Sequence, residues 1–93
     1  MPKAHDKHIL LHKQNIAKKL KKEILNQEIS FEKAAKRYSK CPSGKDGGDL
    51  GEFNKGDMVK EFDKVVFTCD LNRIHGPIKT EFGFHLIQII SRS

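Results

Sequence analysis

The sequence contains no tryptophan, one tyrosine and only two cysteines among its 93 residues. Two cysteines are too few for a disulfide framework, and they do not have the Cys-x-x-Cys spacing of a zinc or redox site. No apolar run approaches the roughly 20 residues of a membrane-spanning helix, and the N-terminal residues lack the apolar segment of a secretory signal. We therefore expect a cytoplasmic protein that does not bind membranes and keeps both thiols reduced.

Positive charge is what the chain has in excess. Its 18 lysines and arginines outnumber 12 aspartates and glutamates, which gives a formal net charge of +6. Such a charge favours acidic partners in general. The densest lysine cluster, at residues 18–22, has no interleaved aromatic residues and no nucleic-acid-binding motif, so nucleic-acid binding is not expected. The length suits one domain over residues 1–93, which we expect to be monomeric.

The spacing of apolar residues predicts four strands and three helices in the order β-α-α-β-α-β-β. The helices are expected at residues 14–28, 31–38 and 58–67, with Asn15, Ser30 and Asp57 as their N-caps. The strands are expected at residues 7–12, 50–53, 78–80 and 84–91. Because the last strand carries apolar residues on both faces, we expect it to pair with the first strand in the middle of the sheet. The fold class is therefore α+β, with helices packed on a small sheet.

A loop rich in Gly, Ser and Pro contains Cys41, within the segment SKCPSGKDGGDLGEF at residues 39–53. About a dozen residues without a regular element is long for a compact domain, and such loops are often functional. A structural cysteine usually packs in an apolar core. The Cys41 thiol is therefore either incidental or presented by the loop to a ligand.

Two histidines, His8 and His85, stand at the start of the predicted first and last strands, so their imidazoles meet if these strands are neighbours. One hypothesis is a cysteine hydrolase with Cys41 as nucleophile and either histidine as base, although no thiol-protease signature surrounds Cys41. A second is a metal site formed by His5, His8 and His12. Their spacing would converge only on a helix, and the predicted strand separates them, so no metal is expected.

Several motifs together resemble the parvulins, a family of peptidyl-prolyl cis/trans isomerases. They are HILL in the first strand, GGDLGEF followed by G-x-M-x-x-x-F in the middle, and GP with FG-x-H near the end. The similarity runs nearly end to end and is closest to the small single-domain bacterial type. It implies a four-stranded antiparallel sheet surrounded by helices, with room for an extra helical turn, and an enzyme without a cofactor.

The resemblance also implies a role for eight residues. His8 and His85 are implied to pair beneath the site, with Thr80 in the same hydrogen-bond network. Cys41 is implied to face the isomerising bond, at a position that holds Asp in some relatives. The apolar pocket for the proline ring is implied to comprise Leu50, Met58, Phe62 and Phe82.

The resemblance further predicts the kind of substrate. Parvulins selective for phosphorylated Ser/Thr-Pro carry an arginine-containing loop after the first strand, whereas here the strand runs directly into the helix. His12 and Lys13 are weak substitutes for a bidentate arginine. We therefore expect isomerisation of unphosphorylated Xaa-Pro bonds in peptides and unfolded polypeptides, as an aid to folding. The alternative is a chaperone-like module that binds peptides in the same groove without needing turnover.

Overall fold

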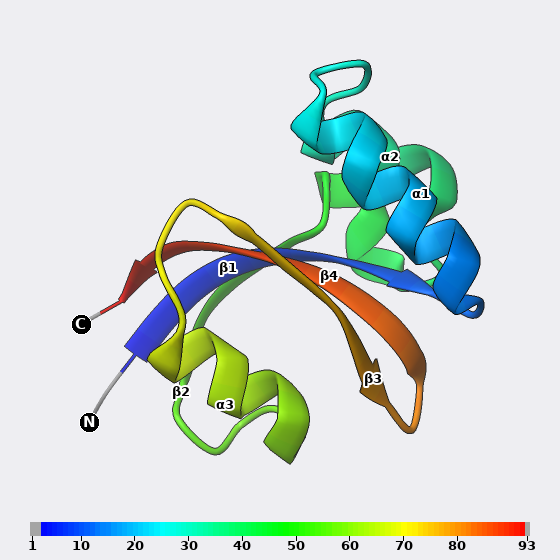
Figure 1. The fold of residues 1–93 in the computed structure, drawn as a ribbon. Helices are drawn as coiled ribbons and strands as arrows, with labels where there is room; N and C mark the ends of the chain where they lie inside the picture. Colours follow the sequence, from blue (N-terminus) through cyan, green and yellow to red (C-terminus); the bar gives the residue numbers. More distant parts are fainter. Residues whose placement is uncertain (1–2, 93) are drawn as a thin grey trace.

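The computed structural model describes residues 3–92 and contains one antiparallel sheet with the strand order β2-β1-β4-β3 (Figure 1). The two central strands are β1 (Lys3–Leu11) and β4 (Gly83–Arg92), which pair from Ala4 to Leu11. The edge strands are β2 (Asp49–Asn54) and β3 (Ile74–Thr80). The predicted α+β class and the central pairing of the first and last strands are confirmed.

The helices cover the two faces of the sheet unequally. Helices α1 (Gln14–Leu25) and α2 (Phe31–Tyr38) lie together over one end of one face, whereas α3 (Lys60–Thr68) lies against the other face (Figure 1). The first core contains Ile9, Leu11, Ala17, Leu20, Phe31, Ala34, Ala35 and Leu86. The second contains Ala4, Phe53, Phe62, Val66, Ile87 and Ile89. Successive residues of β4 therefore alternate between the two cores, as expected for a central strand.

Only one of the three predicted helix caps is correct. The Ser30 hydroxyl accepts a hydrogen bond from the backbone N–H of Lys33, as an N-cap should. The prediction for Asn15 is wrong, because α1 begins at Gln14 and Lys13 occupies the cap position. The prediction for Asp57 is also wrong. Its carboxylate accepts from the backbone N–H of Asn54, the last residue of β2, and α3 begins only at Lys60.

Other boundaries also differ from the sequence-based prediction. Helix α1 ends at Leu25, three residues before its predicted end. Strand β1 begins at Lys3, so His8 is an interior residue of that strand and does not open it. Strand β3 begins at Ile74, four residues earlier than predicted. The loop with Cys41 contains a short 3-10 helix, η1 (Pro42–Asp46), which agrees with the extra helical turn that the resemblance allowed.

The loop between α2 and β2 runs along the second half of β1. The backbone N–H of Lys40 donates to the carbonyl of Leu10, and the N–H of His8 donates to the carbonyl of Gly48. Gly48 has a φ of +87°, and a Cβ atom there would lie 2.4 Å from the His8 carbonyl oxygen. Only glycine permits this close approach. The loop is thereby held directly beside His8.

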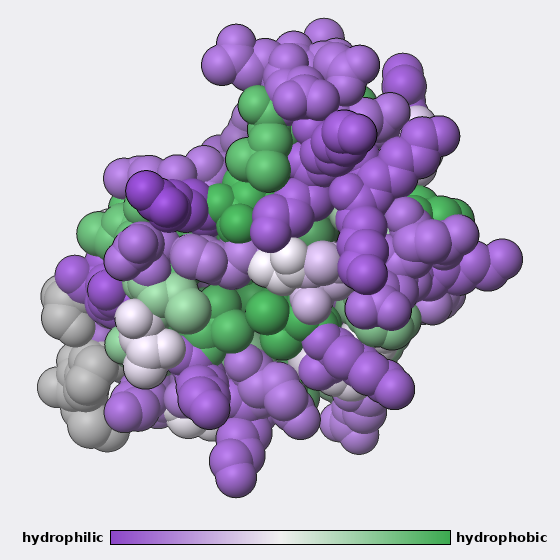
Figure 2. Space-filling view, in the orientation of Figure 1, coloured by the Kyte–Doolittle hydropathy of each residue, from purple (hydrophilic) through white to green (hydrophobic). Residues whose placement is uncertain are grey.

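No helix within residues 3–92 is long and apolar enough to cross a membrane. Hydrophobic side chains nevertheless reach the surface in several places in Figure 2, among them one beside α1 and α2 and one above α3. The rest of that face is largely hydrophilic.

Candidate active site

Two buried histidines from the central strands form the middle of the candidate site. The Nδ1 atoms of His8 and His85 lie 3.1 Å apart, and the two ring planes are nearly parallel, at 17°, with centroids 5.3 Å apart. The pairing of β1 with β4 brings them together, because His8 is opposite Ile87 and His85 is opposite Leu10. The expected meeting of the two imidazoles is therefore confirmed.

Phe62 of α3 packs edge-on against both imidazoles. Its ring centroid lies 5.6 Å from that of His8 and 5.5 Å from that of His85, with interplanar angles of 82°. Phe53 of β2 packs against Phe62 at 6.4 Å. Aromatic contacts of this geometry orient the rings and exclude water from them.

The hydrogen-bond network extends from His85 to the β3–β4 turn. The Oγ1 of Thr80 lies 2.7 Å from the Nε2 of His85, and both side chains are buried. The backbone N–H of Phe82 donates to the same Thr80 oxygen at 3.1 Å. The predicted place of Thr80 in the histidine network is thus confirmed as geometry, and the turn that carries Phe82 is tied to it.

On the other side, Ser43 connects His8 to Cys41. The Ser43 hydroxyl lies 3.1 Å from the Nε2 of His8 and donates to the Sγ of Cys41 at 3.3 Å. Sequence reasoning missed Ser43, since a serine in a Pro-Ser-Gly turn is normally explained by the turn itself. The sequence feature that could have indicated a role for Ser43 is its position two residues after Cys41. Both residues are half-buried.

The directions of these hydrogen bonds determine the histidine tautomers. Because Ser43 donates to Cys41, its oxygen accepts from the Nε2–H of His8. The Nδ1 of His8 is then the acceptor for the Nδ1–H of His85, whose Nε2 accepts from the Thr80 hydroxyl. From the Phe82 amide to the Ser43 hydroxyl, each group in this series of hydrogen bonds thus donates in the direction of the Cys41 sulfur.

Both imidazoles are neutral at physiological pH. Burial, together with a smaller effect of the neighbouring His85, lowers the pKa of His8 from 6.5 to about 4. Burial also lowers the pKa of His85. The shared hydrogen bond requires one unprotonated Nδ1, so the neutral form is also the one that fits the geometry.

The other predicted pocket residues come from different elements. Leu50 of β2 and Met58 are half-buried against the core that contains Phe62. Met58 does not share a helix face with Phe62 as predicted, because it precedes the start of α3. Phe82 lies in the β3–β4 turn and is 57% exposed, so its ring is available to a ligand. Their roles as proline-pocket residues stay predictions.

Two of the histidines outside this network, His5 and His75, have other partners. The Nε2 of His5 lies 2.7 Å from a carboxylate oxygen of Asp49, and the Nε2 of His75 bonds to the carbonyl oxygen of Asp70. Across residues 3–92, no three His, Cys, Asp or Glu side chains are grouped as a metal site requires. The pairing of His5 with Asp49 accounts for one of the three histidines that the metal hypothesis used.

Asp6 is a buried carboxyl beside this site. It precedes His8 by two residues on β1, it is fully buried, and neither oxygen has a hydrogen-bond partner among the described residues. Burial raises its pKa to about 7; His5 opposes this rise and Asp49 adds to it. Sequence reasoning did not foresee this residue.

A family comparison identifies the fold. Residues 3–91 match the model of the PPIC-type PPIase domain, which is nearly the whole chain. This chain is a parvulin. The eight predicted residues and Ser43 therefore belong to a parvulin-type peptidyl-prolyl isomerase domain.

Known parvulins agree in sequence and in structure. The foldase protein PrsA of Geobacillus kaustophilus is 38% identical over 92 residues, which cover 98% of this chain and 32% of PrsA. The crystal structure of a peptidylprolyl isomerase (PrsA) from Bacillus anthracis superposes with a TM-score of 0.93 at 34% identity, over 99% of this chain and 42% of that one. The parvulin NmPin of Nitrosopumilus maritimus gives a TM-score of 0.84 at 38% identity, covering 98% of both chains.

The relatives differ greatly in length. This chain spans about a third of the PrsA proteins that it matches but nearly all of NmPin. The four-stranded parvulin sheet predicted from the motifs is confirmed by these structures and by the strand order described above.

Proposed function

We propose that this parvulin is a peptidyl-prolyl cis/trans isomerase that acts on unphosphorylated Xaa-Pro bonds and assists protein folding. The supporting observation is the chain of neutral hydrogen-bonding groups from Thr80 to Cys41, which runs past the Phe62 ring. It offers polar atoms to an amide without placing a charge beside it. The names and structures of the PrsA relatives point to the same chemistry.

The reaction needs little more than such a site. Rotation about an Xaa-Pro bond meets a barrier of roughly 20 kcal/mol because the C–N bond has partial double-bond character. A twisted amide is less polar than a planar one, so an apolar pocket around the proline favours it. Each tenfold acceleration requires about 1.4 kcal/mol of transition-state stabilisation. A few contacts from Phe62, Phe82, Met58 and Leu50, with hydrogen bonds from the network, are sufficient.

The geometry supports a non-covalent mechanism. A nucleophilic cysteine needs an adjacent base that accepts its proton. Here Ser43 lies between Cys41 and His8, and the Nε2 of His8 donates toward Cys41. The Cys41 sulfur therefore acts as a polar group facing the rotating amide, in agreement with the replacement of this cysteine by aspartate that the family resemblance implies.

The preference for unphosphorylated substrates rests on the connection after β1. Strand β1 ends at Leu11 and α1 begins at Gln14, so only His12 and Lys13 lie between them. Arg92 is engaged elsewhere, because its guanidinium donates to the carbonyls of Val66 and Cys69. A bidentate arginine grip on phosphate is the usual basis of phosphopeptide selectivity, and this short connection does not supply one.

Exchange NMR on a short unphosphorylated Xaa-Pro peptide tests the proposal. We expect catalytic amounts of protein to accelerate cis/trans exchange, and Phe82→Ala to reduce the acceleration at least about tenfold through lost pocket contact. Phe82 is exposed, so this variant should fold. Tyr38→Ala, which removes another exposed aromatic ring from α2, is the matched control. Peptide binding without acceleration would favour the chaperone-like alternative. A cytoplasmic location and a monomeric state stay predictions.

A further inference from the structure

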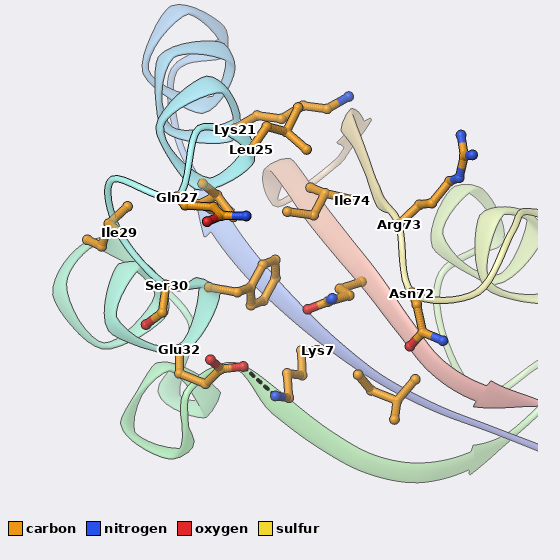
Figure 3. A pocket seen from close by; sticks show the side chains of 14 residues that line it. Lys7, Lys21, Leu25, Gln27, Ile29, Ser30, Glu32, Asn72, Arg73 and Ile74 are labelled. Carbon is orange, nitrogen blue, oxygen red and sulfur yellow. Dashed lines mark hydrogen bonds and ion pairs between the residues drawn. The ribbon is translucent and has the colours of Figure 1, made fainter.

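A large groove lies on the sheet face opposite the Phe62 site. It has a volume of about 960 Å³ and lies between the end of α1, the start of α2 and strands β3 and β4 (Figure 3). Helices α1 and α2 cover only one end of this sheet face, so Gln88 and Ile90 of β4 line the groove. Both alternate along β4 with Ile87 and Ile89, which belong to the core beneath α3. The lining residues include none of the eight predicted site residues.

The groove is rich in apolar side chains that the core does not fully bury. Ile24, Ile29 and Ile74 pack only partly against the first core, and Leu25 at the end of α1 is 59% exposed. Figure 3 shows Leu25 and Ile74 on either side of the groove. Single exposed leucines are common on protein surfaces, but several apolar side chains around one hollow indicate a binding surface.

Cations border this apolar surface. Lys7, Lys21 and Arg73 line the groove together with one carboxylate, Glu32, which forms an ion pair with Lys7. The Nζ of Lys21 donates to a neutral group, the carbonyl of Gly76, at 2.8 Å. Arg73 is exposed, and its ion pair with Asp70 is long, with 3.9 Å between the Arg73 Nε and the Asp70 carboxylate oxygen. Lys21 and Arg73 therefore leave positive charge at the groove that a ligand carboxylate can neutralise.

We propose that this groove binds segments of unfolded polypeptide in which apolar side chains are flanked by aspartate or glutamate. The apolar side chains would contact Leu25, Ile74 and Ile90, and the carboxylates would pair with Lys21 and Arg73. The amides of Gln27, Asn72 and Gln88 at the same groove offer hydrogen bonds to a peptide backbone. This inference rests on the proposed isomerase function only in the choice of ligand, an unfolded polypeptide.

The test uses a fluorescein-labelled, proline-free peptide of alternating leucine and aspartate, with fluorescence anisotropy as the readout. We expect saturable binding that weakens about tenfold in Leu25→Ser, which removes one leucine contact, and at least about fivefold in Arg73→Glu. Leu71→Ser, which changes another exposed leucine, is the control for Leu25→Ser. Lys64→Glu, which changes an exposed lysine of α3, is the control for Arg73→Glu. Both controls should stay within about twofold of wild type.

Four results would overturn the inference. Equal losses in Lys64→Glu and Arg73→Glu, or equal binding of a serine-aspartate peptide, would mean that the protein attracts any acidic chain. A loss in Phe82→Ala but not in Leu25→Ser would place the peptide in the proline site. Concentration-dependent amide shifts of Ile74 and Gln88 without peptide would mean that a second copy of the chain occupies the groove.

The same variants separate this site from the isomerase proposal. If Leu25→Ser loses peptide binding while it still accelerates Xaa-Pro exchange, the groove and the catalytic site are independent, as proposed. If wild type fails to accelerate exchange but binds the acidic peptide through Leu25, the isomerase proposal fails and the groove remains. Amide shifts of Ile74 and Gln88 on adding peptide would locate the bound ligand directly.

Discussion

Replacing Asp6 with alanine should stabilise the protein at neutral and alkaline pH. The Asp6 carboxyl is fully buried and its oxygens have no hydrogen-bond partner within residues 3–92, so its ionised form has lost water without compensation. Its pKa rises from 3.8 to about 7. The side chains of His5 and Asp49 bond to each other and have opposite effects on the pKa of Asp6.

The sign and size follow from the linkage between protonation and folding. Well below the unfolded pKa of 3.8 the carboxyl is protonated in both the folded and the unfolded chain, so it has no net electrostatic cost. As the pH rises toward 7, the unfolded chain ionises while the folded chain does not, which lowers the free energy of unfolding. Above the folded pKa of about 7 the loss is complete, about 4 kcal/mol, since each tenfold step is worth about 1.4 kcal/mol.

Urea unfolding followed by far-UV circular dichroism measures this effect, since the chain has no tryptophan for fluorescence. Asp6→Ala should unfold at higher urea than wild type at about pH 8, and the difference should shrink as the pH falls toward 4. Asp70→Ala, which removes an exposed carboxyl, is the control and should change little. An Asp6→Ala protein that is no more stable than wild type at about pH 8 would refute an uncompensated buried carboxyl.

Three further predictions concern the active site. Ser43→Ala should keep the fold but lower the rate of Xaa-Pro exchange about tenfold, because the link between His8 and Cys41 is lost; an unchanged rate would contradict the role of the link. Gly48→Ala should lower the free energy of unfolding by at least about 2 kcal/mol, because its Cβ would clash with the His8 carbonyl. Gly51→Ala, with a φ of +70° but no neighbour within 4 Å, is the control and should cost less in urea unfolding. Turnover of an uncharged peptide should be constant from about pH 6 to 8 and fall below about pH 5, when His8 is protonated; a decline centred near pH 6.5 would show that His8 is not buried as described.

Sequence reasoning succeeded where short-range signals decide the structure. Helix α2 has the predicted bounds because Ser30 caps it and its apolar residues recur on one face. The central pairing of β1 with β4 followed from apolar residues on both faces of the last strand. The motifs around His8, Cys41 and His85 were sufficient for the family.

Sequence reasoning failed for polar side chains whose hydrogen-bond partner could not be foreseen from neighbouring residues. Asp57 resembles a helix cap in sequence, but its carboxylate accepts a hydrogen bond from the backbone N–H of Asn54. Ser43 becomes part of the site only because the loop lies beside His8, 35 residues away in sequence. Polar residues usually indicate solvent exposure, so the first residues of β1 were not recognised as a strand.

Two neighbouring buried groups on β1 make the stability of this parvulin depend on pH in opposite directions. The pKa of His8 is lowered, so its contribution to stability is present above about pH 6.5 and is lost as the pH falls toward 4. Asp6 has a raised pKa, and its contribution is lost over nearly the same range as the pH rises. Between about pH 4 and 6.5, His8 makes the free energy of unfolding rise with pH and Asp6 makes it fall. The two effects therefore partly cancel in the wild-type protein. Above about pH 7 only the cost of the Asp6 carboxylate remains, so a neutral His8 network coexists with a destabilised strand two residues away.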